Sequence, residues 1–266
     1  MESTLLTRVN PVRPVAPYLG GKRILAKTII ERINAIDHTL YAEPFVGMGG
    51  VFFRRTMRPK VEVINDISAD VITLFRILQW HYQAFLDTIK WQLASRDEFD
   101  LLMKVDPDTL TDLRRAARFL YVQRVGFGGK VAGRGFGLTR TNPSRFDLNK
   151  LVAMLEDVHD RLTSVTIERL HFADFISKYD TTTTLFYLDP PYWNNESDYG
   201  AGTFSQADFG RLKGILEGIK GRFILSINDR PEVREIFKAF TIEPVDLNYR
   251  ISGTSTPAKE LVISNG

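Results

Sequence analysis

The chain has 266 residues, of which 44% are apolar and 25% are charged, and its formal net charge is +3. This length fits one core, or a core with a modest second unit, because domains usually span about 100–200 residues. The absence of cysteine excludes disulfide frameworks, thiolate zinc sites and cysteine nucleophiles.

The sequence shows no sign of export or membrane insertion. Its first sixteen residues lack the apolar core of a signal peptide, and no apolar run reaches the ~18 residues that a membrane span needs. We therefore expect a soluble, cytoplasmic protein with no membrane partner.

Short apolar runs alternate with helix-length segments over residues 22–70 and again from residue 147 to the end. The runs cover residues 39–45, 60–66, 164–170, 184–191, 221–229 and 259–265. Apolar runs of this length that end in polar or proline-rich turns indicate the buried strands of an α/β sheet. The pattern therefore predicts an α/β fold.

A glycine-rich string, EPFVGMGG at residues 43–50, follows the first run. Glycines between a strand end and a helix N-terminus let a cofactor approach the backbone. The string is not a dinucleotide fingerprint, because Phe52 stands where G-x-G-x-x-G has its third glycine. Asp66 ends the next run, where an acidic residue can bind ribose hydroxyls. The plainer alternatives are a strand–turn–helix corner for the glycines and a helix cap for Asp66.

The middle of the chain, about residues 72–145, has a different pattern. It begins with helical periodicity and ends in a segment with six glycines interleaved with Arg, Lys and Phe. We predict a mostly helical insertion at residues 76–146 with a basic loop. It interrupts one α/β domain formed by residues 1–75 and 147–266.

Positive charge is concentrated in this insertion. Residues 113–146 contain eight basic residues and no acidic ones, so the rest of the chain carries a net charge of −5. A local positive field favours a polyanionic partner, most often nucleic acid. The alternative is a solvated basic face that serves solubility alone.

The most specific string is DPPY at residues 189–192, directly after an apolar run. Ligands of open α/β sheets bind beyond the carboxyl ends of strands, so this tetrapeptide is expected to face a cleft. Two prolines remove two N–H donors, which leaves nearby carbonyl groups able to accept from a ligand. A carboxylate, a free carbonyl and an aromatic ring suit a planar group that carries an amino group. The alternative is a proline-rich turn capped by an acid.

The clearest helix runs from Ser205 to Gly221. Ser205 and Asp208 have the spacing of a capping box, and apolar residues recur every three or four positions to form one face. Gly221 stands where a C-terminal glycine is expected.

Together these strings resemble the Dam-type DNA adenine-N6 methyltransferases. PYLGGK at residues 17–22, FVGMG at 45–49, the insertion and DPPY occur in the order typical of that family, over residues 15–265. The resemblance implies a Rossmann-like sheet that binds S-adenosylmethionine, with helices on both faces and an inserted recognition domain. It also implies a site-specific adenine methyltransferase that acts on double-stranded DNA, as in restriction–modification.

Roles for individual residues follow from the resemblance. For the cofactor these are Tyr18 and Lys22 at the N-terminal motif, Phe45, Gly47 and Gly49 along the methionine, Asp66 at the ribose, and Asp174 and Phe175 at the adenine. Asp189, Pro190 and Tyr192 are implied to be catalytic and to hold the target base. A helix N-cap is the alternative for Asp174, and surface packing is the alternative for Tyr18.

The recognition insertion resembles the family less closely. FLYVQRVGFGG at residues 119–129 is similar to a family segment in which an aromatic residue enters the base stack, so Phe127 is implied to be such a wedge. Arg124, Lys130 and Arg134 are further candidates for DNA contacts. The target sequence is not carried over, and the oligomeric state is not predicted.

The expected chemistry needs alignment more than activation, because the sulfonium methyl group is already reactive. Hydrogen bonds from adenine N6 to the Asp189 carboxylate and the Pro190 carbonyl favour a tetrahedral nitrogen and in-line transfer. The base must first leave the duplex and stack on Tyr192.

Several alternatives stay open at this point. Cytosine N4 offers the same amino chemistry, and a DNA-binding protein could keep the fold without catalysis. Methylation of a protein glutamine typically accompanies Asn rather than Asp before the PPY, whereas cytosine C5 methylation is excluded because it needs a cysteine. The four histidines lack ligand spacing, so no metal is predicted.

Overall fold

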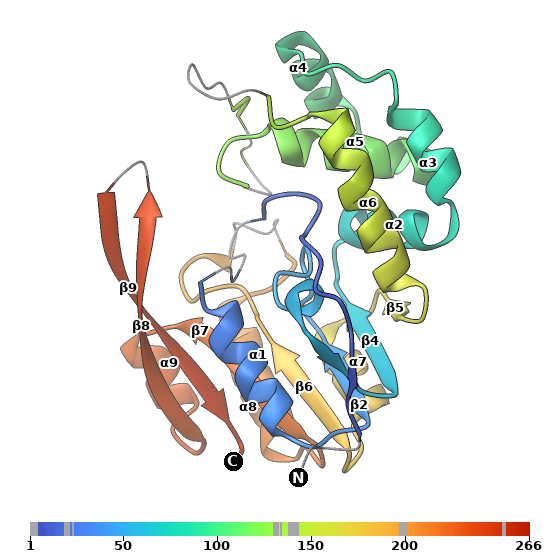
Figure 1. Ribbon diagram of the computed structural model, residues 1–266. Coiled ribbons are helices and arrows are strands. Elements are labelled where there is room, and N and C mark those ends of the chain that lie inside the picture. Colours follow the sequence, from blue (N-terminus) through green and yellow to red (C-terminus); the bar gives the residue numbers. More distant parts are fainter. Residues whose placement is uncertain are drawn as a thin grey trace.

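The computed structural model describes residues 5–18, 22, 24–129, 133, 135–137, 144–196, 202–251 and 254–266, with only the backbone described for 247–251 and 254–258. Its centre is a seven-stranded sheet in the order β5-β4-β2-β6-β7-β9-β8 (Figure 1). The strands are β2 (Leu40–Glu43), β4 (Val61–Asn65), β5 (Thr166–Glu168), β6 (Thr184–Leu188), β7 (Arg222–Asn228), β8 (Thr241–Ile251) and β9 (Thr254–Ser264). The first five strands in this spatial order are mutually parallel, whereas β9 is antiparallel to β7 and to β8.

All six predicted apolar runs form strands of this sheet, so the predicted α/β fold is confirmed. The pattern of apolar runs does not predict β8, nor a small separate sheet of β1 (Thr7–Arg8) and β3 (Met57–Arg58).

Helices cover both faces of the sheet, as predicted. Alternate residues of a strand point to opposite faces. Leu185 and Tyr187 of β6 therefore join one hydrophobic cluster, while Phe186 and Leu188 join another. The first cluster includes α1 (Ala26–Ala35), and the second includes α7 (Phe172–Tyr179), α8 (Gln206–Glu217) and α9 (Pro231–Ile236).

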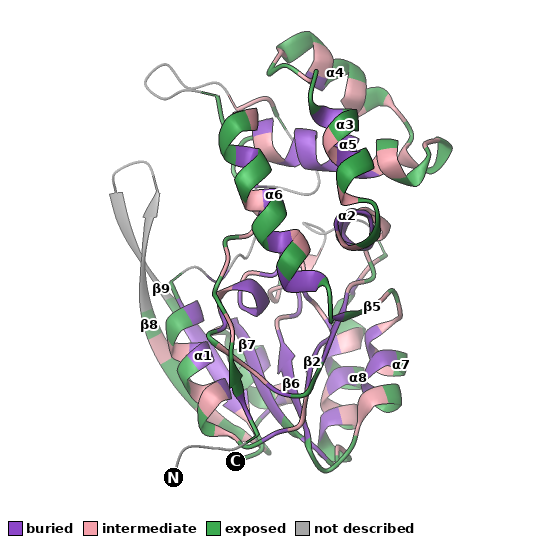
Figure 2. Cartoon of the chain, turned by 45° about the vertical axis from the view of Figure 1, so that its right-hand side comes forward, coloured by how far each residue is buried: buried purple, intermediate pink, exposed green. Residues whose placement is uncertain are grey.

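The predicted helical insertion forms a layer at one end of the sheet, opposite the two termini (Figure 1). It contains α2 (Ala69–Trp80), α3 (Tyr82–Ile89), α4 (Arg96–Lys104) and α5 (Asp112–Val125), with a short 3-10 turn at Pro107–Thr109, and is followed by α6 (Leu148–Leu162). A second 3-10 turn, Phe52–Arg54, lies between β2 and β3. Figure 2 shows buried residues along α5 and α6. The apolar residues among them belong to the same hydrophobic cluster as Leu185 and Tyr187 of the sheet. The expected boundary between residues 75 and 76 therefore falls inside α2 and inside one continuous core.

The predicted helix at 205–221 is confirmed with a shorter C-terminus. Ser205 and Asp208 form the expected capping box, but the helix is capped by Gly218. Gly221 serves another purpose, because a Cβ atom there would lie 2.5 Å from the carbonyl oxygen of Thr184. The glycine lets β7 begin close to the start of β6.

A buried ion triad joins α6 to the sheet. Arg55 and Arg161 both bind Glu62 of β4, each with nitrogen–oxygen distances of 2.7 Å. The two guanidinium groups also lie over the rings of Tyr41 and Phe52, at 3.7 and 4.1 Å from the ring centroids. The triad therefore fixes the helical layer above the strands.

In the described part of the chain, no helix is long and apolar enough to cross a membrane. Within the same residues, no group of three or more acidic or histidine side chains could hold a metal ion.

We predict that Glu62→Ala lowers the free energy of unfolding by about 3–5 kcal/mol, because it leaves two buried guanidinium groups without their carboxylate. Urea unfolding measures the change. Glu235→Ala is the control, because it removes a carboxylate from the exposed Lys238 pair, which is worth about 0–1 kcal/mol. A loss below about 1 kcal/mol for Glu62→Ala contradicts the role of the triad.

Candidate active site

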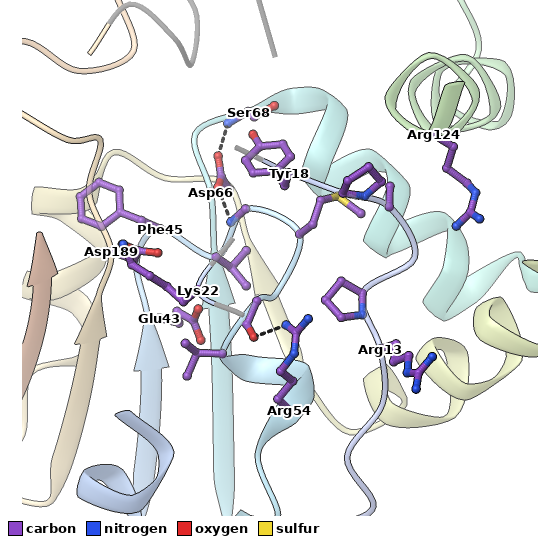
Figure 3. A pocket seen from close by; sticks show the side chains of 18 of the residues that line it. Arg13, Tyr18, Lys22, Glu43, Phe45, Arg54, Asp66, Ser68, Arg124 and Asp189 are labelled. Atoms are coloured by element: carbon purple, nitrogen blue, oxygen red, sulfur yellow. Dashed lines mark hydrogen bonds and ion pairs between the residues drawn. The ribbon is translucent and has the colours of Figure 1, made fainter. Parts of the chain in front are cut away.

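A cavity of about 1050 Å³ lies where the carboxyl ends of β2, β4 and β6 meet (Figure 3). Parallel strands end at one edge of a sheet, so the residues that follow them are neighbours in space. Phe45 and Gly47 follow β2, Asp66 follows β4 and Asp189 follows β6, and all of them line the cavity. Tyr18 and Lys22 line it from the segment before α1. The structure thus brings together six of the predicted cofactor and catalytic residues, and Arg124, predicted as a DNA contact, lines the same cavity.

The glycine turn is held by Asp66. The amide of Gly47 donates to Asp66 Oδ2 at 2.8 Å, and the amide of Ser68 donates to Oδ1 at 2.8 Å (Figure 3). Burial raises the pKa of Asp66 to about 6, although these backbone donors oppose the shift. The carboxylate therefore fixes the loop and borders the cavity at once.

Two positions in this turn require glycine. Gly47 has a φ of +49° and Gly49 a φ of +71°, a region that L side chains rarely adopt. A Cβ on Gly49 would lie 2.3 Å from the buried ring of Phe53, and one on Gly47 would lie 3.0 Å from the ring of Tyr18. Gly49 itself does not line the cavity, so its contribution is to the shape of the turn.

The tip after β6 carries a charged network. Lys22 Nζ lies 2.9 Å from Asp189 Oδ1 and donates to the Tyr192 hydroxyl at 2.7 Å. Ser226 of β7 also donates to Asp189 Oδ1, at 3.3 Å. Burial raises the pKa of Asp189 to about 6, while the Lys22 ammonium acts to lower it. Asp189 is therefore mostly ionised at neutral pH.

Of the other DPPY residues, Pro191 lines the cavity, whereas Pro190 is buried and Tyr192 is half-buried beside Lys22. Asp189 is consequently the one member of the three predicted catalytic residues that borders the cavity directly.

Glu43 lines the cavity but is not among the site residues predicted from the sequence. It ends β2, is 1% exposed and accepts a hydrogen bond from the Tyr41 hydroxyl at 2.8 Å. Burial raises its pKa to about 8. The available signal was an acidic residue at the end of an otherwise apolar run, directly before the glycine turn.

The structure does not bring Asp174 and Phe175 into the cavity. The apolar face of α7 packs on the sheet, so Phe175 is 0% exposed and contacts Tyr179 within the core. Asp174 lies in the first turn of α7 and lines a separate shallow depression. Their predicted contacts with the cofactor's adenine are not supported by this placement, because the helix periodicity places the Phe175 ring on the inner face.

Arg124, expected to contact DNA, forms hydrogen bonds within the protein, and its contact with DNA stays a prediction. Its guanidinium donates to the backbone carbonyls of Arg145, at 2.8 Å from Nε, and Val15, at 2.5 Å from Nη1. These bonds fasten the N-terminal segment to α5, so most of its donors serve the fold.

Other basic residues between positions 113 and 146 also form contacts within the protein. Arg115 pairs with Asp70 and Asp108, and the buried Arg118 donates to the carbonyl of Leu102. Arg114 and Arg145 are exposed. Lys130 and Arg134 lie outside the described residues, so their expected DNA contacts stay predictions.

Phe127 is an exposed aromatic residue, and its role as a wedge in the base stack stays a prediction. It follows α5 and is 64% exposed. Its amide donates to the carbonyl of Gly135 at 2.8 Å, and the amide of Gly137 donates to that of Val125 at 2.8 Å. These bonds fix the base of the loop and leave the ring in solvent.

A parallel sheet with a glycine turn and acidic strand ends around one cavity defines an α/β enzyme with a nucleotide-type cofactor site. The family model for D12 class N6 adenine-specific DNA methyltransferases matches residues 18–251. The chain belongs to this family. Its function is therefore the methylation of adenine N6 in DNA, which sets aside the cytosine alternative.

Curated relatives extend over nearly the whole chain. The type II methyltransferase M.CviBI of Paramecium bursaria Chlorella virus NC1A is 22% identical, over 96% of this chain and 100% of that protein. M1.LlaDCHI of Lactococcus lactis subsp. cremoris is 25% identical, over 96% and 95%. The DNA adenine methylase of Escherichia coli K12 is 24% identical, over 94% and 92%.

Among solved structures, the glycopeptide N-methyltransferase MtfA in complex with S-adenosyl-L-methionine has a TM-score of 0.34 and 13% identity. The match covers 94% of this chain and 71% of that one.

We predict that Gly49→Ala costs roughly 1–3 kcal/mol of stability and impairs the turn, because the new Cβ meets Phe53 at a positive φ. Thermal unfolding and cofactor titration measure both effects. Gly210→Ala in α8 is the matched control, since its Cβ enters open space and a helical alanine gains about 0.5–1 kcal/mol. Equal stability of the two variants would count against the geometry of the turn.

Proposed function

We propose that the chain binds S-adenosyl-L-methionine in the cavity and methylates an adenine that has left double-stranded DNA. In this proposal the Asp189 carboxylate and the Pro190 carbonyl receive the amino group. The observation that carries it is the position of Asp189, which Lys22 holds in the same cavity as the Gly47–Asp66 pair.

The residues around the cavity fit the parts of this cofactor. Asp66 has lone pairs left for ribose hydroxyls, and Ile67 lines the cavity as an exposed apolar side chain beside the base. The Glu43 carboxyl group suits the methionine ammonium, which favours its ionised form. When bound, the cofactor supplies an electrophilic methyl group on a sulfonium.

Asp189 performs two tasks in the proposed reaction. Its ionised carboxylate accepts a hydrogen bond from N6, which orients the nitrogen lone pair toward the methyl group. N6 would take the methyl group that the bound cofactor supplies, and the electron pair of the broken carbon–sulfur bond would stay on sulfur. The proton that N6 then releases passes to Asp189 and on to water.

Tyr192 and Phe127 serve the base itself. Lys22 contacts both the Tyr192 hydroxyl and the Asp189 carboxylate. The ring of Tyr192 is proposed to stack on the extruded adenine. Phe127 is proposed to fill the gap that the base leaves in the stack. The exposed Arg114 and Arg145 are available for phosphate contacts that offset the cost of unstacking.

Asp189→Ala is expected to reduce methyl transfer to adenine by about 10²-fold or more, because the acceptor for N6 is lost. Cofactor affinity is expected to persist, since the glycine turn is intact. Single-turnover transfer of labelled methyl groups and cofactor titration separate the two. Asp157→Ala, on an exposed position of α6, is the control.

The wild-type transfer rate provides a second check on Asp189. It is expected to rise with pH, to be half-maximal near pH 6 and to level off above about pH 7, because Asp189 must lose its proton to accept from N6. Near-normal transfer by Asp189→Ala contradicts the assignment, as does a wild-type rate that stays flat from pH 5 to 8.

Phe127→Ala is expected to slow transfer on fully paired duplexes by roughly tenfold, equivalent to 1.4 kcal/mol of unstacking that is no longer offset. The defect should shrink when the target adenine is mismatched, because such a base leaves the stack more easily. Trp91→Ala, which removes another exposed aromatic ring of the helical layer, is the control. A defect of equal size on paired and mismatched DNA argues against a wedge.

A further inference from the structure

Glu260 is a buried carboxylate beside the site with no part in the reaction described above. It lies on β9, opposite Asn228 at the end of β7, and is 1% exposed. Burying a carboxylate is costly unless a positive group and hydrogen bonds compensate it. Its surroundings therefore indicate what the residue does.

The compensating group is the ammonium of Lys22. Lys22 Nζ lies 3.2 Å from Glu260 Oε2 and 2.9 Å from Asp189 Oδ1. The Tyr192 hydroxyl accepts from Lys22 and donates to Glu260 Oε1. The Glu260 carboxylate on β9 thus contacts both the Lys22 ammonium and the hydroxyl of Tyr192, the last residue of DPPY.

The end of β7 also holds the loop that follows the DPPY residues. The Asn228 side chain accepts from the amide of Trp193 at 2.9 Å and donates to its carbonyl at 3.1 Å. Glu260 and Asn228 are partners in the β7–β9 ladder, so the side-chain bonds and the backbone register act on the same short segment.

The contacts on Asp189 show what this arrangement achieves. Lys22 and Ser226 both bind Oδ1, and Asp189 lines the cavity. When Glu260 fixes the position of Lys22, the rotation of the Asp189 carboxylate is fixed as well. Its other oxygen, Oδ2, is then left for the ligand. A Lys22 held by Asp189 alone would be free to move with it.

We propose that Glu260 is a positioning residue for methyl transfer, which fixes Lys22 and Tyr192 so that Asp189 presents a carboxylate oxygen to the adenine amino group. This inference rests on the proposed function of Asp189. It concerns geometry and charge at a distance from the substrate, because Glu260 acts through Lys22 and Tyr192.

The charge of Glu260 has a consequence that a purely packing role lacks. The groups that face Asp189 are the Lys22 ammonium, the Glu43 and Glu260 carboxyl groups, and the hydroxyls of Tyr187 and Ser226. Among them Glu260 acts to raise the pKa of Asp189 and Lys22 acts to lower it. Removing the Glu260 charge should therefore lower the pKa of Asp189.

The test compares Glu260→Gln and Glu260→Asp with wild type in single-turnover methyl transfer from pH 5 to 9, with saturating cofactor and duplex DNA. We expect a loss of about 10²-fold for Glu260→Gln, the cost of misplacing a reacting group by about 1 Å. The acidic limb of its rate profile should move to lower pH. Glu260→Asp keeps the negative charge on a shorter side chain. It should therefore transfer methyl groups more slowly than wild type, with the acidic limb of its pH–rate profile at the wild-type pH.

Controls separate the possible failures. Glu243→Gln changes an exposed carboxylate of β8 that binds Arg32, and it should match wild type. A Glu260→Gln enzyme with wild-type rate and limb overturns the proposal, and so does a slower enzyme with an unmoved limb. If Glu260→Gln does not fold, Glu260→Asp decides, because a wild-type rate overturns the proposal. An inactive wild type instead refutes the proposed function itself.

Discussion

Asp189 and Glu260 place two carboxylates around one ammonium, that of Lys22, in a region largely closed to water. Burial raises the pKa of Asp189, and the Lys22 ammonium opposes that shift and so favours the ionised carboxylate. The ammonium also accounts for the position of the Tyr192 hydroxyl, which it contacts directly. The proposed chemistry depends on this interaction, since an ionised Asp189 is acceptor-only, so that Oδ2 can accept from the amino group while Oδ1 binds Lys22.

The sheet topology assembles this interaction from distant parts of the chain. Lys22 precedes α1, Asp189 follows β6, and Glu260 lies on a strand that runs antiparallel to β7. The glycine turn and Asp66 come from β2 and β4, on the other side of β6 in the sheet. In the proposed function, the part of the cavity assigned to the cofactor and the part assigned to the base therefore meet at the carboxyl end of the central strand, where methyl transfer is proposed to occur.

Local strings predicted much of this arrangement, because strand ends and tight turns leave a short-range signature. The glycine turn, Asp66 and Asp189 were found in this way, and the structure gathers them in one cavity. Glu260 was not found, because its neighbours come from positions 22 and 192 and nothing near it in the sequence indicates them. The strand β8 was missed since its polar residues and Pro244 interrupt the apolar pattern. The internal contacts of Arg124 were not predicted, because its neighbours in the sequence do not reveal that backbone carbonyls accept from its guanidinium, and its DNA contact stays a prediction.

The central claim is that the Lys22 ammonium keeps Asp189 ionised and in place. Its most direct test is the pH dependence of single-turnover methyl transfer by Lys22→Met with saturating cofactor. Because the ammonium lowers the pKa of Asp189, its loss should move the acidic limb to higher pH and reduce the rate far more at pH 6 than at pH 8. A Lys22→Met enzyme whose limb coincides with that of wild type contradicts the account.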